Sequence, residues 1–158
     1  MRSQIAVRLL AEVPDKTETL VALYESEWSD WYGPAGPGNA RADLRESLNT
    51  DRLPVVFVAV DDQGCAVGSA ALKQHSLPSH PYLSPWLSAF VVDPSQRGRG
   101  IGSTLAEAVA ERARMLDFSR IYCGTTSAYG MLTRLGWIDM HDRAPAEFGN
   151  VAILSKIL

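Results

Sequence analysis

The residues best suited to chemistry lie together in one glycine-rich run, Arg97-Gly98-Arg99-Gly100-Ile101-Gly102, which Ser103 follows. Glycine allows a positive φ and a close approach of the backbone to a ligand. Arg97 and Arg99 add charge-assisted hydrogen-bond donors, and Ser103 adds a hydroxyl. If a helix begins after this run, its first N–H groups and its dipole also favour an anion. The run therefore predicts a turn that binds phosphate.

The segments on either side of this turn have the patterns of a strand and a helix. Residues 87–92 are apolar, include β-branched Val91 and Val92, and lie between two prolines, which predicts a buried strand. Residues 103–116 repeat apolar side chains at helical spacing, which predicts an amphipathic helix. An ordinary glycine-rich turn that binds no ligand is the alternative interpretation.

Two common phosphate motifs do not fit the turn. A P-loop needs Gly-Lys before Ser or Thr, and the sequence has no Gly-Lys pair. The dinucleotide fingerprint Gly-x-Gly-x-x-Gly fails because Ser103 stands where its last glycine is needed. A nucleotide-binding protein is therefore a minor alternative.

The turn resembles the acetyl-CoA motif of the GNAT superfamily of N-acetyltransferases, Arg/Gln-x-x-Gly-x-Gly/Ala. The preceding Val92-Asp93-Pro94 matches the Val-x-Pro usual in that family. Residues 128–137 also resemble the family pattern Ala-x-x-x-Tyr-x-x-Leu-Gly-Phe, with Leu132 at the tyrosine position. The resemblance implies an α/β acyl-CoA N-acyltransferase fold with a mixed sheet and the element order β-α-α-β-β-β-α-β-α-β-β.

The resemblance also implies acetyl-CoA as the cosubstrate and no metal. Its pantetheine amides are expected to pair with the backbone at Phe90 and Val92, with Val91 between them. A backbone N–H of this strand would polarise the thioester carbonyl, and an amine of a small molecule or a protein would attack it directly in a ternary complex. A non-catalytic acyl-CoA sensor is the alternative. The residues expected at the pyrophosphate are Arg97, Gly98, Arg99, Gly100, Ile101, Gly102 and Ser103.

Neither motif assigns the proton transfers. Leu132 has no proton to donate, so Tyr129, three residues earlier on the same helix face, is the candidate acid. A packing role is the other interpretation of Tyr129, since a thiolate with a pKa of about 8.5 can leave without an acid. Glu27 is the candidate base, because an apolar neighbour such as Trp28 makes a carboxylate more basic. A solvated carboxylate at a helix end is the alternative.

The acceptor site is expected beside an aromatic segment that follows the first predicted helix. Trp28, Trp31 and Tyr32 stand at the start of a Gly/Pro-rich loop, residues 29–39. In the resembling family, the segment between the first two helices covers the acceptor. His80, in the proline-rich connection 76–85, is a further candidate contact, and the histidines at 75, 80 and 141 are alternative bases. A hydrogen bond to a loop carbonyl is the other interpretation of His80.

The remaining elements follow from periodicity and from turn residues. Thr17 is expected to cap the first helix and Asn39 the second. The predicted elements are strands over 4–10, 55–61, 66–73, 120–124, 137–142 and 150–157, and helices over 17–28, 40–48 and 127–135.

Composition predicts an ordinary globular protein. The 158 residues are 46% hydrophobic and 21% charged, which suits one domain over residues 1–158. A net charge of −3 disfavours nucleic acid as a partner. No apolar run approaches the roughly 18 residues of a membrane span, and Cys65 and Cys123 have no disulfide or metal spacing. The expectation is a cytoplasmic monomer or homodimer.

Overall fold

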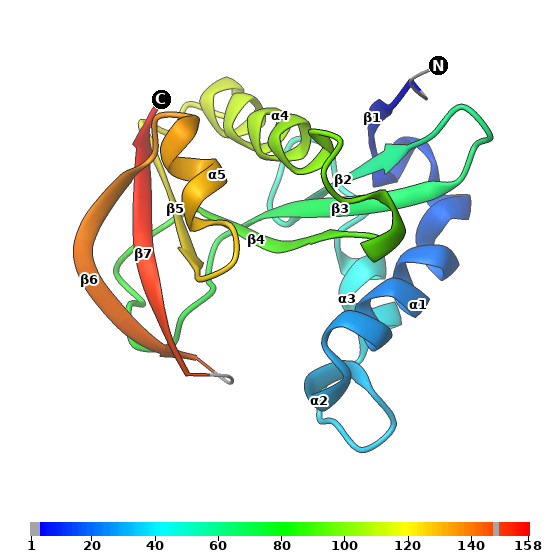
Figure 1. The fold of residues 1–158 in the computed structure, drawn as a ribbon, viewed down its shortest axis with the longest axis horizontal. Helices are drawn as coiled ribbons and strands as arrows, with labels where there is room; N and C mark the ends of the chain where they lie inside the picture. Colours follow the sequence, from blue (N-terminus) through cyan, green and yellow to red (C-terminus); the bar gives the residue numbers. More distant parts are fainter. Residues whose placement is uncertain (1–3, 147–148) are drawn as a thin grey trace.

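A computed structural model describes residues 4–146 and 149–158, and within them one seven-stranded mixed sheet has helices on both faces (Figure 1). The strand order is β1-β2-β3-β4-β5-β7-β6, and only the β4–β5 pair is parallel. The strands are β1 (Ala6–Leu9), β2 (Val55–Val60), β3 (Ala66–Lys73), β4 (Trp86–Val92), β5 (Arg120–Thr125), β6 (Ile138–Ala146) and β7 (Gly149–Ile157). The helices are α1 (Thr17–Glu27), α2 (Ser29–Tyr32), α3 (Ala40–Glu46), α4 (Ile101–Met115) and α5 (Tyr129–Arg134), with 3-10 turns at Leu10–Glu12, Pro14–Lys16 and Pro94–Gln96.

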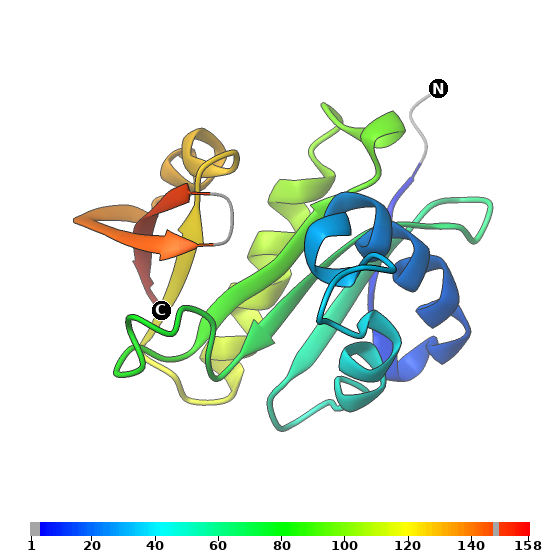
Figure 2. The ribbon, with the colours of Figure 1, turned by 90° about the horizontal axis from the view of Figure 1, so that it is seen from below.

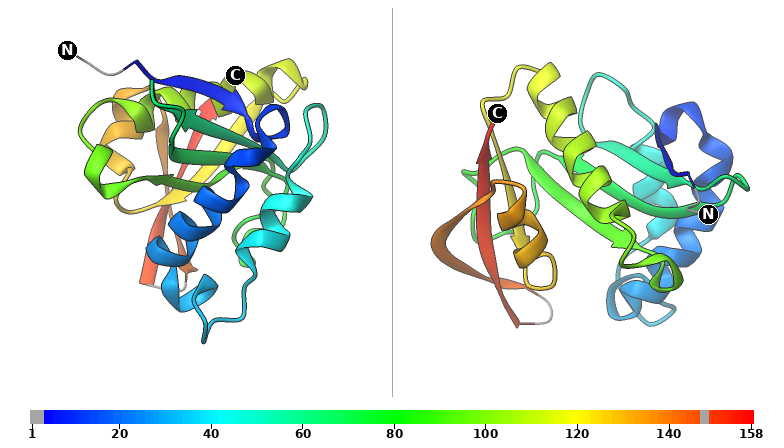
Figure 3. Two further views of the ribbon diagram at one scale, coloured as in Figure 1. Left: turned by 90° about the vertical axis from the view of Figure 1, so that its right-hand side faces the viewer. Right: turned by 45° about the horizontal axis from the view of Figure 1, so that its top comes forward.

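The central strands β2 and β3 are mostly apolar and almost wholly buried because helices cover both of their faces (Figure 3). Successive side chains of a strand point to opposite faces. Val55 and Phe57 therefore pack in the core on the α4 side, whereas Val56 and Val58 pack in the core that includes α1 and α3. The predicted α/β class and acyl-CoA N-acyltransferase fold are confirmed.

Several helix boundaries differ from the sequence predictions, and helix α5 spans Tyr129–Arg134 rather than residues 127–135. Helix α4 begins at Ile101 rather than at residue 103, because Gly100 takes a left-handed conformation with φ of 78° and serves as its N-cap. Thr17 does not cap α1. It lies inside the helix, and its hydroxyl donates to the carbonyl of Pro14 at 2.7 Å. Helix α3 ends at Glu46, but the predicted cap by Asn39 is confirmed, since its side chain accepts from the N–H of Ala42 at 3.0 Å.

Two segments are more regular than the sequence suggested. The predicted loop over 29–39 begins with helix α2, since the carbonyl of Trp28 accepts from the N–H groups of Trp31 and Tyr32. Strand β6 continues past residue 142 to Ala146, because β7 offers it a pairing partner along that length.

The sheet divides between β4 and β5, which are paired at only one position, Trp86 with Tyr122 (Figure 2). Beyond that pair the two strands diverge. Strand β4 also has a bulge: Ser88 and Val91 are three residues apart, but their β3 partners Ala71 and Ser69 are only two apart, and Ala89 has a φ of 48°. The backbone of β4 from Leu87 onward therefore has no β5 partner, which leaves its polar groups facing an opening.

Candidate active site

One side of this opening is a groove of about 520 Å³ where the glycine-rich turn leads into α4. Most of its lining comes from the end of β4, the turn and the first residues of α4, and the rest comes from the ends of α1 and α5. The groove is lined by Glu27, Phe90, Val91, Val92, Gln96, Arg97, Gly98, Gly100, Ile101, Gly102, Ser103, Ser127, Ala128, Met131 and Arg134.

The turn has the geometry that an anion needs. Gly98 and Gly100 have φ of 81° and 78°, and a Cβ added at either would meet nothing within 4 Å. The space above the backbone is thus open. The 15-residue helix α4 begins there, so its first N–H groups lie at this space. The Nε of Arg97 donates to the carbonyl of Val92 at 3.0 Å, which holds its guanidinium beside the groove. These residues fit a pyrophosphate.

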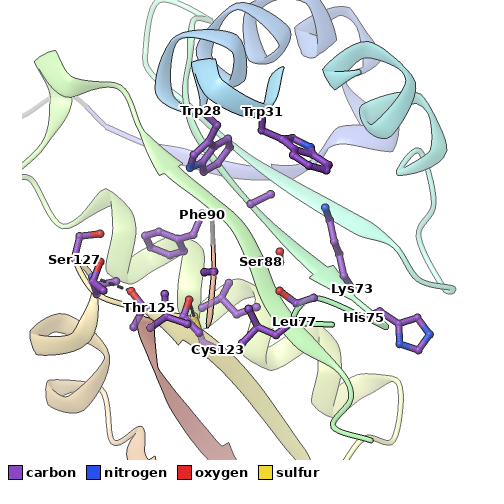
Figure 4. A pocket seen from close by; sticks show the side chains of 18 of the residues that line it. Trp28, Trp31, Lys73, His75, Leu77, Ser88, Phe90, Cys123, Thr125 and Ser127 are labelled. Carbon is purple, nitrogen blue, oxygen red and sulfur yellow. Dashed lines mark hydrogen bonds between the residues drawn. The ribbon is translucent and has the colours of Figure 1, made fainter. Parts of the chain in front are cut away.

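The other side of the opening is a cavity of about 820 Å³, which we call the acceptor cavity (Figure 4). It shares Phe90, Ser127 and Ala128 with the groove, so the two spaces meet there. The cavity also takes residues from the α1–α3 segment, from the end of β3 and the loop after it, and from β5 and β7. The remaining lining is Trp28, Trp31, Tyr32, Asp43, Lys73, His75, Ser76, Leu77, Pro78, Leu87, Ser88, Ala89, Cys123, Gly124, Thr125, Thr126, Leu132, Pro145, Ala146 and Val151.

Aromatic side chains form one wall of the acceptor cavity. The rings of Trp28 and Tyr32 contact each other and Tyr24, with the Tyr24–Trp28 centroids 5.1 Å apart. The loop after α2 folds back closely over Trp31, because a Cβ at Gly38 would collide with that indole. The N–H of Gly38 donates to the carbonyl of Trp31 at 2.8 Å, which closes the loop.

The charged side chains of the cavity are few, although serine and threonine hydroxyls also line it. The hydroxyl of Tyr32 donates to Asp43 Oδ2 at 2.6 Å. Lys73 is half-buried at the end of β3, and its burial lowers the pKa of its ammonium. Burial also raises the pKa of the Cys123 thiol to about 12, so Cys123 is not a nucleophile at neutral pH.

The sequence matches the model of the acetyltransferase (GNAT) family over residues 20–137. The chain belongs to that family. A comparison with curated protein sequences finds no match.

Solved structures of GNAT proteins are similar to this one in fold. An aminoglycoside 6'-acetyltransferase type Ii is 20% identical, with 96% of each chain covered and a TM-score of 0.74. An aminoglycoside 6'-N-acetyltransferase complexed with coenzyme A is 16% identical, with 96% of each chain covered and a TM-score of 0.75. An N-acetyltransferase from Staphylococcus aureus Mu50 is 16% identical, covers 98% of this chain and 99% of its own, and has a TM-score of 0.73. At these identities the likeness shows the fold alone.

The GNAT turn and the aromatic segment lie where the sequence placed them, with one exception. Arg99 does not line the groove, because its guanidinium donates to the side chain of Gln96 at 3.1 Å. A second cation, Arg134 of α5, lines it instead. Residues three apart share a helix face. Arg134 is three residues from Met131, which also lines the groove, and this spacing is the sequence signal that could have predicted Arg134 there.

The two candidates for proton transfer do not lie in the acceptor cavity. Glu27 ends α1 and its carboxylate accepts from Arg97 Nη2 at 3.0 Å, so it belongs to the groove. Tyr129, in the first turn of α5, lines neither space, because its hydroxyl is directed to Asp139 on β6 at 2.9 Å. That hydrogen bond raises the pKa of Tyr129. In this geometry Glu27 lines the groove and Tyr129 lines neither space, so the base role of Glu27 and the acid role of Tyr129 stay predictions.

His80 does not line the acceptor cavity either. Its ring is buried, with Nε2 2.7 Å from Asp142 Oδ2 and Nδ1 2.7 Å from the hydroxyl of Ser79. The hydrogen bond from His80 lowers the pKa of Asp142. His80 therefore ties the loop over 76–85 to β6. Of the other two histidines, His75 lines the cavity and His141 does not.

Within residues 4–146 and 149–158, no three His, Cys, Asp or Glu side chains are grouped as metal ligands would be. None of the helices described there is long and apolar enough to cross a bilayer.

Proposed function

We propose that this GNAT protein transfers the acetyl group of acetyl-CoA to a primary amine. The observation that carries the proposal is that the groove and the acceptor cavity meet at Phe90, Ser127 and Ala128. A pyrophosphate bound at the turn would let the pantetheine arm follow β4 to this junction. The thioester would then face an amine held in the cavity. We propose one catalytic domain over residues 1–158, working in the cytoplasm, where its free thiols Cys65 and Cys123 are compatible with the reducing conditions.

The chain contributes positioning and charge stabilisation. Arg97, Arg134 and the first N–H groups of α4 would hold the pyrophosphate. The β4 backbone at Phe90 and Val92 would pair with the pantetheine, and a backbone N–H beside the bulge would donate to the thioester oxygen. The amine nitrogen forms a bond to the acetyl carbon, the carbon–sulfur bond breaks, and the electron pair leaves on sulfur. Overall, the amine nitrogen loses one proton and the CoA thiolate gains one.

We assign no acid or base side chain to these proton transfers. A thiolate with a pKa of about 8.5 leaves with little help. The hydroxyl of Ser127, which lines both spaces at their junction, is a candidate carrier for these protons. Bringing the amine and the thioester together would then supply most of the rate enhancement.

The test measures binding and turnover separately. Saturating acetyl-CoA should raise the melting temperature, since a ligand at a hundredfold excess over its Kd adds about 2.7 kcal/mol of stability. Free thiol should then appear when a panel of primary amines is added. No thermal shift would refute the assignment of the groove.

A non-catalytic acyl-CoA sensor is the second candidate. Leu132, fully buried at the family's tyrosine position, favours it. A thermal shift with acetyl-CoA and no thiol release from any amine would support the sensor over the enzyme.

A further inference from the structure

The charges that line the acceptor cavity are unusual for a site that would receive a polycation. Among the described lining residues, Asp43 supplies the one carboxylate, and Lys73 and His75 are the basic side chains. An acceptor with several ammonium groups would be attracted by several carboxylates. This cavity therefore does not favour an acceptor of the kind named for the two aminoglycoside acetyltransferases of similar fold.

The single carboxylate already has a hydrogen-bond partner inside the cavity. Asp43 lies on α3 and accepts from the hydroxyl of Tyr32 at 2.6 Å. A short hydrogen bond of this kind uses part of the acceptor capacity of the carboxylate. Asp43 therefore serves to fix the aromatic wall, and an incoming cation would have to share it.

Lys73 differs from Asp43 because no side chain among the described residues holds its ammonium by a hydrogen bond or an ion pair. No hydrogen bond or ion pair joins it to residues 4–146 or 149–158, and Asp43 and Glu46 attract it only from beyond contact distance. Burial lowers its pKa, so holding the charge there has a cost that an anionic partner would offset. Figure 4 shows the Lys73 side chain rising from the end of β3 toward Trp31, while His75 points away from both tryptophans.

We infer that the amine acceptor carries a carboxylate or an equivalent anion, and that Lys73 binds it. The inference rests on the proposed acetyl transfer and adds a substrate class to it. The amine end of the acceptor would reach the junction at Phe90 and Ser127, with its carbon skeleton along the aromatic wall. Lys73 would hold the opposite, anionic end. It is a specificity-determining residue and takes no part in bond making.

The test compares acids with their neutral amides on the full chain. Glycine, 3-aminopropionate, 4-aminobutyrate, 5-aminopentanoate and 6-aminohexanoate vary the distance between amine and carboxylate, and each is paired with its carboxamide. At saturating acetyl-CoA, kcat/KM should be about 10- to 100-fold higher for the best acid than for its amide, as expected for one charge-assisted hydrogen bond. The amide has the less basic amine, so amine basicity works against this result.

Variants then assign the preference to Lys73. Lys73→Met should reduce kcat/KM for the best acid to the value for its amide, leave the amide and the acetyl-CoA Kd unchanged, and lose no more stability than a surface change. Lys73→Arg should keep most of the preference. Lys16→Met removes the same charge outside the cavity and should leave the preference intact.

Two results would overturn the inference. One is an acid-to-amide ratio within twofold for every length in the unaltered protein. The other is an equal loss for acid and amide in Lys73→Met. If no amine of either kind releases thiol, the proposed acetyl transfer fails instead. Calorimetry with the same acids and amides on the CoA-saturated protein then decides the inference alone, because tighter binding of an acid that Lys73→Met abolishes would support it and equal binding would refute it.

Discussion

The groove and the acceptor cavity meet at Phe90, but they are built in different ways. The groove comes mainly from one continuous segment, residues 90–103, and offers ligands its backbone and the end of a helix. The acceptor cavity collects side chains from segments far apart in the sequence, from Trp28 to Val151. A site made of backbone depends on φ and ψ, whereas a site made of side chains depends on which residues stand at its wall. Donor binding and acceptor choice should therefore respond to different kinds of substitution.

The largest expected effect separates backbone shape from fold stability in the groove. Gly100→Val and Gly64→Val are matched, since both glycines have a φ of 78° and open space where a Cβ would stand. Each change should cost about 1–2 kcal/mol of folding free energy, because a side chain is strained in that conformation. Gly64 lies in the β2–β3 turn, so only Gly100→Val should weaken acetyl-CoA binding, by about a hundredfold through lost phosphate hydrogen bonds. Calorimetry on both variants measures this, and equal Kd values would place the pyrophosphate elsewhere.

The same contrast explains why the groove was accessible to sequence analysis. A glycine turn between a strand and a helix is a local pattern, and its residues stay neighbours in space whatever the rest of the chain does. Except for Arg99, the residues predicted to bind acetyl-CoA all line the groove. Arg99 does not line the groove, because Gln96, three residues before it, offers its side-chain carbonyl as a local partner.

The acceptor cavity was only partly accessible for the opposite reason. The sequence predicts Trp28, Trp31 and Tyr32 because they lie within five residues of one another in one segment. Lys73 could not, since nothing near it in sequence shows that β4 and β5 diverge beside it. His80 was assigned to the acceptor because it precedes the central strand, but its partner Asp142 lies 62 residues away. Side-chain sites need the tertiary register that single-sequence patterns do not carry.

The fold was more predictable than either site. Strands β2, β3 and β4 and helix α4 have strong periodicity and were found within two or three residues of their ends. The missed features, α2 and the last residues of β6, depend on hydrogen bonds from the carbonyl of Trp28 and on pairing with β7. Neither depends on a repeating apolar pattern.

A smaller effect concerns the ion pair between Glu27 and Arg97 in the groove. Glu27→Gln should tighten acetyl-CoA binding by up to about fivefold, because it frees Arg97 and removes a negative charge beside the phosphates. An exposed ion pair is worth only about 0.2–1 kcal/mol, which limits the gain. Isothermal titration calorimetry measures the acetyl-CoA Kd, and steady-state kinetics measure kcat, which should change less than twofold. A loss of 100-fold or more in kcat would restore Glu27 as the base, since general base catalysis has that magnitude. Glu25→Gln, two residues earlier on α1 and outside the groove, is the control.

The smallest effect is expected from Tyr129→Phe. The hydroxyl of Tyr129 donates to Asp139 and lies outside both spaces, so its removal should leave kcat and the acetyl-CoA Kd within twofold of their values. General acid catalysis typically contributes about 10²–10⁴-fold, so a loss of that size would show that the tyrosine turns into the junction during catalysis. Comparing acyl donors whose leaving thiols differ in pKa sharpens the test, because a true acid matters most for the poorest leaving group.

A pH series checks that Tyr129→Phe removes the interaction seen here. The pKa of Asp139 is held at about 2 by the backbone N–H of His141 first, then by Arg143 and Tyr129. A carboxyl whose pKa is lowered by folding adds stability above its unfolded pKa, and that stability is lost as the pH falls toward the folded value. Tyr129→Phe should therefore be slightly less stable than the parent at pH 7, and the difference should shrink as the pH falls through the lowered pKa of Asp139, about 2, and vanish below it. Because Asp139 keeps its two other donors in the variant, the difference at pH 7 should stay small. Unchanged turnover together with this pH-dependent difference would assign Tyr129 to the α5–β6 contact. A stability difference that does not vary with pH would instead show that the substitution altered the packing of the ring rather than the hydrogen bond.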